Sequence, residues 1–133
     1  MKFAAAYAAT AIVMLSLDAL WLGVIAKPLY QQGIGHLMAE RPNLAIAALF
    51  YAVYALGIVL FAVMPQAIDS WGRAALTGAL FGFFAYATYD LTNLATLKQW
   101  PLGVALIDIA WGSAVSAVSA AAGKLALDRI AGG

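Results

Sequence analysis

The sequence predicts an all-α membrane protein, with four transmembrane helices in a compact up-and-down bundle and both termini on the same side. Two observations predict this fold class. The 133 residues are 65% hydrophobic and only 10% charged, and their mean hydropathy is +0.92, which leaves too little polar surface to cover a soluble domain. The apolar residues also surround each predicted helix for about 20 residues at a time, whereas a soluble helix carries them on one stripe.

Four apolar stretches are long enough to span a membrane, and together they make the chain a single domain, 1–133. They cover residues 3–26, 43–63, 73–96 and 101–125. Each can cross about 30 Å of hydrocarbon at a rise of about 1.5 Å per residue. Prolines punctuate the connections, because proline stops a helix or begins one: they are Pro28, Pro42, Pro65 and Pro101. Only the longest connection, 27–42, has the length to fold locally.

The first stretch begins like a secretory signal peptide, with Lys2 followed by an apolar run. We interpret it as a retained helix, because the run is long, carries Asp18 and lacks a small-x-small cleavage site before Lys27. The chain has no cysteine, which excludes a disulfide framework and a thiolate nucleophile. A net charge of +1 gives no reason to expect a nucleic-acid partner.

The distribution of basic residues favours cytoplasmic termini. With four spans, both termini and the 65–72 turn share one side, which we name the terminal side, and the other two connections share the opposite, loop side. The terminal side carries Lys2, Arg73, Lys124 and Arg129, and the loop side carries Lys27, Arg41 and Lys98. By the positive-inside rule, this small excess places the termini in the cytoplasm.

Three of the four stretches carry one aspartate each: Asp18, Asp90 and Asp108. Asp18 lies nine positions before Lys27, Asp90 eight before Lys98 and Asp108 eight after Trp100, which places all three at a depth of about 12 Å from the loop side. Acids inside a membrane are costly and generally face the bundle interior, a partner or water. We therefore predict one layer of carboxylates, with Asp90 as the leading acid or base and Asp18 and Asp108 sharing protons with it.

Polar and aromatic residues accompany these acids. Tyr86, Tyr89 and Asn93 recur with Asp90 at helical spacings of three and four, so we expect them on one inward face. The first and fourth stretches repeat a pattern of aspartate, two residues and tryptophan, which suggests a helix duplication. Its members, Trp21 and Trp111, either donate to the acids, line an apolar slot, or simply pack. Trp71 and Trp100 lie at span ends, where we expect interfacial belt residues.

The loop side carries a candidate headgroup site. Lys27, Tyr30 and Lys98 share this rim and could bind a phosphate or carboxylate group. His36 lies in the same connection and is either a further ligand-binding residue or a solvated loop residue. Small residues on the third and fourth stretches, by contrast, fit a spacing that lets helices approach closely: Gly78, Gly82, Ser113, Ser116, Ala117 and Ala120.

A metal site is the weaker alternative for the acids. Three carboxylates with Asn93 could bind a hard divalent cation such as Mg²⁺. The isolated aspartates lack the close spacings typical of metal motifs, so we assign no metal and require no cofactor.

Several runs resemble a known family. They are residues 89–101 (YDLTNLATLKQWP), 108–112 (DIAWG), 18–23 (DALWLG) and 27–30 (KPLY). Together they are similar to the DUF2177 family of predicted bacterial membrane proteins, over essentially the whole chain. The resemblance implies a multi-pass protein of the bacterial inner membrane with four spans. It implies no activity, catalytic residue or cofactor.

Three functions remain open, and whether the protein is an enzyme is one of the open questions. The off-centre polar layer favours a pocket that opens to the loop side and binds or processes a lipid-like or amphipathic small molecule. The second function is a small proton-coupled transporter acting as a homodimer, since four helices enclose little volume. The third is an accessory or scaffold subunit, in which each aspartate only makes structural hydrogen bonds between helices.

Overall fold

The computed structural model describes residues 1–132, which form five α-helices joined by short turns. The α-helices are α1 (Lys2–Leu20), α2 (Lys27–Ile34), α3 (Leu44–Ile58), α4 (Trp71–Thr96) and α5 (Leu102–Gly132). Two of them continue in π-helical turns, α1 through Trp21–Ile25 and α3 through Val59–Val63. Short 3₁₀ turns follow at Gly35–Leu37 and Met64–Gln66.

Three helices are long and apolar enough to cross a membrane. They cover Lys2–Ile25, Leu44–Gln66 and Leu102–Gly132. The prediction of an all-helical membrane protein is confirmed at this level. The predicted third span, 73–96, does form a helix, α4, but α4 is not among these three. Its arginine, aspartate, asparagine, threonines and tyrosines lower its apolar content relative to the other long helices.

The helix count also differs from the predicted four, because the 27–42 connection contains α2. Pro28 stands in the first turn of α2, where its missing N–H costs no hydrogen bond and its fixed φ suits a helix. The ends of two other helices are set by caps. The side chain of Asn43 accepts from the Ile46 N–H at 3.2 Å, and that of Ser70 accepts from the Arg73 N–H at 3.4 Å, as expected of Asn and Ser before a first turn.

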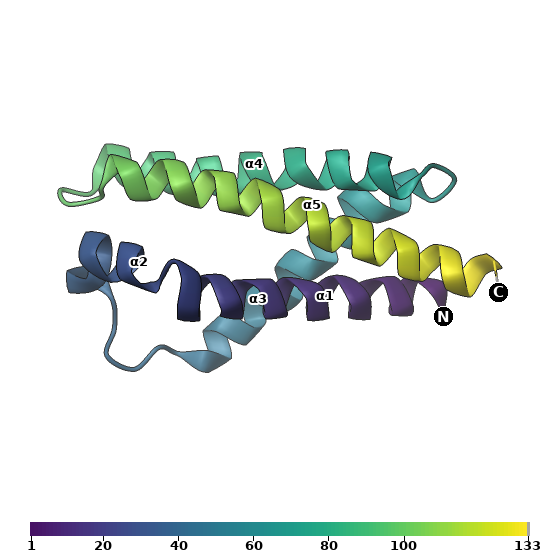
Figure 1. Cartoon of the computed structure of the whole chain (residues 1–133), viewed down its shortest axis with the longest axis horizontal. Helices are drawn as coiled ribbons and strands as arrows, with labels where there is room; N and C mark the ends of the chain where they lie inside the picture. The colour runs from purple at the N-terminus through teal and green to yellow at the C-terminus, as the bar shows by residue number, and fades with distance from the viewer. Residues whose placement is uncertain (133) are drawn as a thin grey trace.

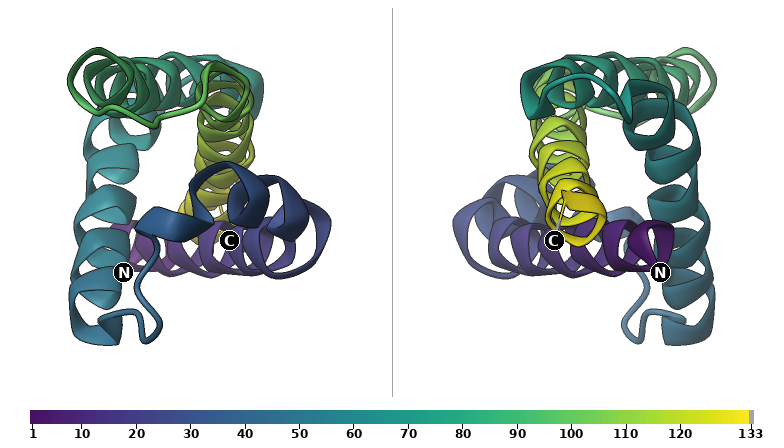
Figure 2. Two further views of the ribbon diagram at one scale, coloured as in Figure 1. Left: turned by 90° about the vertical axis from the view of Figure 1, so that its left-hand side faces the viewer. Right: turned by 90° about the vertical axis from the view of Figure 1, so that its right-hand side faces the viewer.

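The four long helices run between two ends of the molecule (Figure 1). Both termini lie at one end, while α2 and the turn between α4 and α5 lie at the other, which corresponds to the predicted loop side. Seen along the long axis, α4 and α1 lie on opposite sides, and α5 and α3 cross between them (Figure 2).

Small residues allow α4 and α5 to approach closely, as predicted. A Cβ built on Gly82 would lie 2.3 Å from the carbonyl oxygen of Gly112, and one on Gly78 would lie 2.6 Å from the Cβ of Ala120. Neither position has room for a side chain. The Ser113 hydroxyl adds an interhelical hydrogen bond to the Ala79 carbonyl at 2.8 Å.

The core is tightest in the terminal half of the bundle. Its buried apolar side chains include Met14 of α1, Ile58 of α3 and Val115 of α5. A Cβ on Gly123 would lie 2.2 Å from the Thr10 hydroxyl oxygen, so α1 and α5 are also in close contact there. By contrast, α3 meets α4 mainly through its final turn, Val59–Val63, and the first half of α3 stands away from it. This divergence opens the bundle toward the loop end.

Candidate functional site

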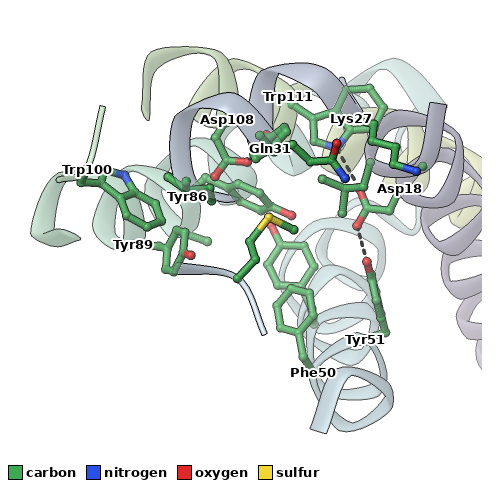
Figure 3. Close-up of a pocket in the computed structure, with 17 residues that line it drawn as sticks. Asp18, Lys27, Gln31, Phe50, Tyr51, Tyr86, Tyr89, Trp100, Asp108 and Trp111 are labelled. Atoms are coloured by element: carbon green, nitrogen blue, oxygen red, sulfur yellow. Dashed lines mark hydrogen bonds between the residues drawn. The ribbon is translucent and has the colours of Figure 1, made fainter. Parts of the chain in front are cut away.

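A cavity of about 580 Å³ lies at the loop end of the bundle. Its walls come from all five helices and from the turn before α5 (Figure 3). Two carboxylates, Asp18 and Asp108, and one lysine, Lys27, line it. Most of the other lining is aromatic or aliphatic. Its tyrosines are Tyr30, Tyr51, Tyr54, Tyr86 and Tyr89, and its other aromatic residues are Phe50, Trp100 and Trp111.

Asp18 is held by two donors from different helices. The Tyr51 hydroxyl of α3 donates to Oδ2 at 2.9 Å, and the Trp111 indole N–H of α5 donates to Oδ1 at 2.8 Å. The Asp18 side chain therefore accepts a hydrogen bond on each of its two oxygens. These two bonds tie α1 to α3 and α5 at the floor of the cavity.

Asp108 is held by a residue of the connection. The Tyr30 hydroxyl of α2 donates to Oδ1 of Asp108 at 2.6 Å, and it accepts from the Trp21 indole N–H at 3.3 Å. Burial, together with the neighbouring Asp108 carboxyl, raises the pKa of Tyr30. The Tyr30 hydroxyl therefore keeps its proton and remains a donor to Asp108.

The two tryptophans of the sequence repeat stack on one another. The ring centroids of Trp21 and Trp111 are 4.4 Å apart, and the ring planes are 5° from parallel. Each indole N–H points toward the acid of the other repeat, Trp111 directly to Asp18 and Trp21 through Tyr30 to Asp108. Because α1 and α5 run in opposite directions, the Asp-x-x-Trp units pair head to tail.

Asp90 is placed differently from the other two acids. It is fully buried, and neither of its carboxyl oxygens has a hydrogen-bond partner among residues 1–132. It lies close to Asp108 and Trp100, and the Trp100 indole N–H is likewise unpaired within the described part of the chain. Among those residues, the cavity lining includes Asp18 and Asp108 but not Asp90. The predicted layer therefore divides into two acids that face the cavity and one behind its wall.

The other predicted site residues separate in the same way. Trp111, Lys27, Tyr30, Tyr86 and Tyr89 line the cavity, and Trp21 reaches it through Tyr30. Of the residues described, Asn93, His36 and Lys98 are not part of the lining. Asn93 lies partly buried in the last turn of α4, and His36 and Lys98 are exposed.

Comparison with known protein families covers most of the chain, including the part that forms this cavity. Residues 3–125 match the family described as "Predicted membrane protein (DUF2177)". The chain belongs to the DUF2177 family. In this DUF2177 protein, the match includes every residue that lines the cavity. A search of curated proteins and a search of solved structures found no match.

Sequence reasoning missed the contribution of α3 to the site. Phe50, Tyr51 and Tyr54 of the DUF2177 protein all line the cavity, and the Tyr54 hydroxyl also bonds the Ser116 hydroxyl at 2.8 Å. Two tyrosines three positions apart in an otherwise apolar span could have indicated a polar contact, because buried hydroxyl groups usually form hydrogen bonds. Trp100, which we expect in an interfacial belt, also lines the cavity and contacts the Tyr89 ring edge to face, with centroids 5.7 Å apart.

The acids do not form a conventional metal-binding set. Within residues 1–132, no three His, Asp or Glu side chains come close enough to hold a metal ion. Asp18 and Asp108 instead receive neutral donors, namely tyrosine hydroxyls and an indole N–H. The arrangement is therefore that of a polar, hydrogen-bonded end to an aromatic cavity.

Proposed function

We propose that this DUF2177 protein binds an amphipathic, lipid-like small molecule in the cavity at its loop end. The observation that carries the proposal is the cavity itself. Its volume of about 580 Å³ is within the roughly 300–1,000 Å³ of known ligand sites. Apolar walls with a few convergent polar groups are also typical of such sites.

The lining separates into two parts that match an amphipathic ligand. Asp18, Asp108 and Lys27 supply charge, whereas Leu22, Ile34 and Met38 supply aliphatic surface. Leu22 and Met38 are both exposed on the protein, so an apolar tail would reach toward the surrounding lipid. If the ligand is also processed, Asp108 with Tyr30 is the strongest candidate for proton transfer, because their oxygens are 2.6 Å apart.

The proposal includes four spans, with α4 as the third in chain order. Both termini lie at the same end of the molecule, which requires an even number of crossings. At 26 residues, α4 exceeds the roughly 20 residues that a span needs, and its carboxyl group, Asp90, is buried in the protein. We place the protein in the bacterial inner membrane, with both termini in the cytoplasm.

A matched pair of glycine substitutions tests the cavity. A Cβ at Gly23 or at Gly103 would meet nothing within 4 Å. Of these two glycines, Gly23 lines the cavity and Gly103 is not part of the described lining. We expect Gly23→Phe to fill part of the cavity without a clash, and Gly103→Phe to leave it open. Mass spectrometry of purified protein should then find an amphipathic molecule bound to the wild type and to Gly103→Phe, and reduced in Gly23→Phe.

Equal retention of the bound molecule by Gly23→Phe and Gly103→Phe would contradict the proposal, because the molecule would then sit elsewhere on the surface. Thermal unfolding of both variants is the control, since a substitution that leaves the fold intact should leave the transition cooperative.

A proton-coupled transporter acting as a homodimer is the second candidate. The head-to-tail pairing of the Asp-x-x-Trp units on α1 and α5 favours it, because many transporters are built from inverted repeats. Proton flux into liposomes that contain the purified protein would support this function. No flux, together with a retained amphipathic molecule, would leave the binding function alone.

A further inference from the structure

We propose that the ligand of this cavity carries a single organic ammonium group, which Asp18 and Asp108 neutralise and the aromatic walls surround. The inference rests on the proposed binding function, because it names the chemical class of the same ligand. Three features of the cavity support it: the charge of its acids, the free acceptor capacity of those acids, and the aromatic character of its walls.

Among the described residues, none forms a salt bridge with the acids of the cavity. Asp18 and Asp108 accept hydrogen bonds from neutral groups only. Within residues 1–132, the one salt bridge joins Lys124 to Asp128, near the end of α5 that carries the C-terminus. Lys27 lines the cavity but forms no ion pair with either acid. A carboxylate shielded from water is strongly destabilised without an opposite charge, so a cationic ligand would relieve both acids.

The acids also retain acceptor capacity. Among residues 1–132, the one hydrogen bond that Asp108 accepts comes from the Tyr30 hydroxyl and falls on Oδ1. An ionised carboxylate offers about four lone-pair sites, so one or more on Asp108 remain for a donor in the cavity. An ammonium group supplies such donors, and its charge strengthens each bond.

The aromatic walls select an organic cation. Phe50 and Tyr54 stack with centroids 5.6 Å apart, and Tyr54 meets Tyr86 edge on at 6.0 Å, so three rings form a continuous wall. Ring faces attract cations, and aromatic surfaces are a common feature of sites that bind organic ammonium groups. A hard metal ion requires several oxygen ligands instead, and the described residues offer no group of three acids or histidines.

The remaining lining defines the rest of the ligand. Leu22, Ile34 and Met38 form an aliphatic surface beside the acids, which suits an alkyl tail. Lys27 contributes a positive charge to the same lining and would repel a second cationic group. The ligand class is therefore an alkyl chain with one ammonium head.

The test compares three probes of equal chain length. They are decylammonium, a decyl glycoside and decyl phosphate, added to protein in nanodiscs of uncharged lipid. Binding is measured by calorimetry. The heat measured with nanodiscs that contain Gly23→Phe is subtracted, because it reports the uptake of the probe by the lipid itself. We expect the ammonium probe to bind at least about tenfold more tightly than the glycoside, equivalent to about 1.4 kcal/mol.

Three variants assign that preference to the cavity. Asp108→Asn should reduce the preference for the ammonium probe severalfold while leaving the glycoside unaffected. Asp69→Asn, at an exposed acid in the turn before α4, is the matched control and should change nothing. Phe50→Leu removes one aromatic ring of the wall at a half-exposed position. It should weaken binding of the ammonium probe and leave binding of the other two probes unchanged, and it provides a second test if Asp108→Asn fails to fold.

The outcomes separate the two proposals. If the glycoside and ammonium probes bind equally, or the phosphate binds best, the ammonium class is wrong and the binding function stands. If no probe binds above the Gly23→Phe level, the proposed function fails with it. A preference for ammonium that survives both Asp108→Asn and Phe50→Leu would also overturn the inference, because the selectivity would then arise elsewhere.

Discussion

Trp21 and Trp111 lie face to face, with ring centroids 4.4 Å apart and planes 5° from parallel. Stacked aromatic pairs contribute about 0.5–1.5 kcal/mol beyond the area they bury. Their more specific role is to connect the acids, because one indole N–H bonds Asp18 and the other reaches Asp108 through Tyr30. The stacked pair therefore links the hydrogen bonds of Asp18 to those of Asp108.

The donor role of Trp111 can be separated from its packing. Trp111→Phe keeps an aromatic ring against Trp21 but removes the N–H that bonds Asp18. We expect a loss of about 1–3 kcal/mol, because a buried acceptor loses one of its two donors. Thermal unfolding in detergent measures the loss. The control is Trp71→Phe at an exposed position at the start of α4, which should change stability by less than about 0.5 kcal/mol; equal effects would refute the role of the N–H.

Tyr30 should make stability depend on alkaline pH. Burial and the Asp108 carboxyl raise the pKa of Tyr30 above its ordinary value of 10.0. The folded state therefore holds this proton where the unfolded chain releases it, so stability is fully present below about pH 10 and falls as the pH rises further. Tyr30→Phe should flatten that fall and, at neutral pH, cost about 1–3 kcal/mol through the unpaired Asp108. Unfolding curves between about pH 8 and pH 12 measure both effects; parallel slopes for wild type and variant would contradict this assignment.

Gly112 has a packing reason to be glycine. A Cβ at this position would lie 2.0 Å from Cγ of Tyr86, so Gly112→Ala must displace a ring that lines the cavity. We expect a loss of about 1–3 kcal/mol from this overpacking. Gly103→Ala on the same helix meets nothing within 4 Å and should be neutral or gain up to about 1 kcal/mol from helix propensity. Similar unfolding temperatures for the two variants would show that Tyr86 adapts freely.

Asp90 and Asp18 should respond in opposite ways to the same substitution. The Asp90 carboxyl is buried without a partner among residues 1–132, so Asp90→Asn removes a potential buried charge and should leave stability unchanged or higher. Asp18→Asn should cost about 1–3 kcal/mol, because one amide oxygen cannot replace two carboxylate oxygens that accept from Tyr51 and Trp111. Unfolding temperatures decide this, and a larger loss for Asp90→Asn would mean that Asp90 has a structural partner.

The absence of cysteine from the sequence permits a direct test of the four spans. Single cysteines replacing Lys2, Asp69 or Lys98 each give one site for a thiol reagent that does not cross membranes. With α4 as a span, positions 2 and 69 should be labelled from the same side and position 98 from the other. Labelling of positions 69 and 98 from one side would show that α4 does not cross.

The sequence by itself determined the class of protein and the level of the polar groups along each helix. Apolar runs of membrane length predict spanning helices, and counting residues from the ends of those runs places Asp18 and Asp108 at one depth. Close α4–α5 packing was also predictable, because Gly78 and Gly82 leave no side chain between the backbones.

Only the tertiary structure decided which groups meet. The spans are apolar on every side, so no stripe of hydrophobic residues fixes how each helix is rotated about its axis. That rotation puts Asp108 in the cavity and Asp90 behind it, and it brings Tyr51 of α3 to Asp18. The head-to-tail pairing of Trp21 with Trp111 likewise depends on α1 and α5 being antiparallel neighbours. Depth is a property of one helix and can be counted, whereas a contact between helices depends on packing that involves the whole bundle.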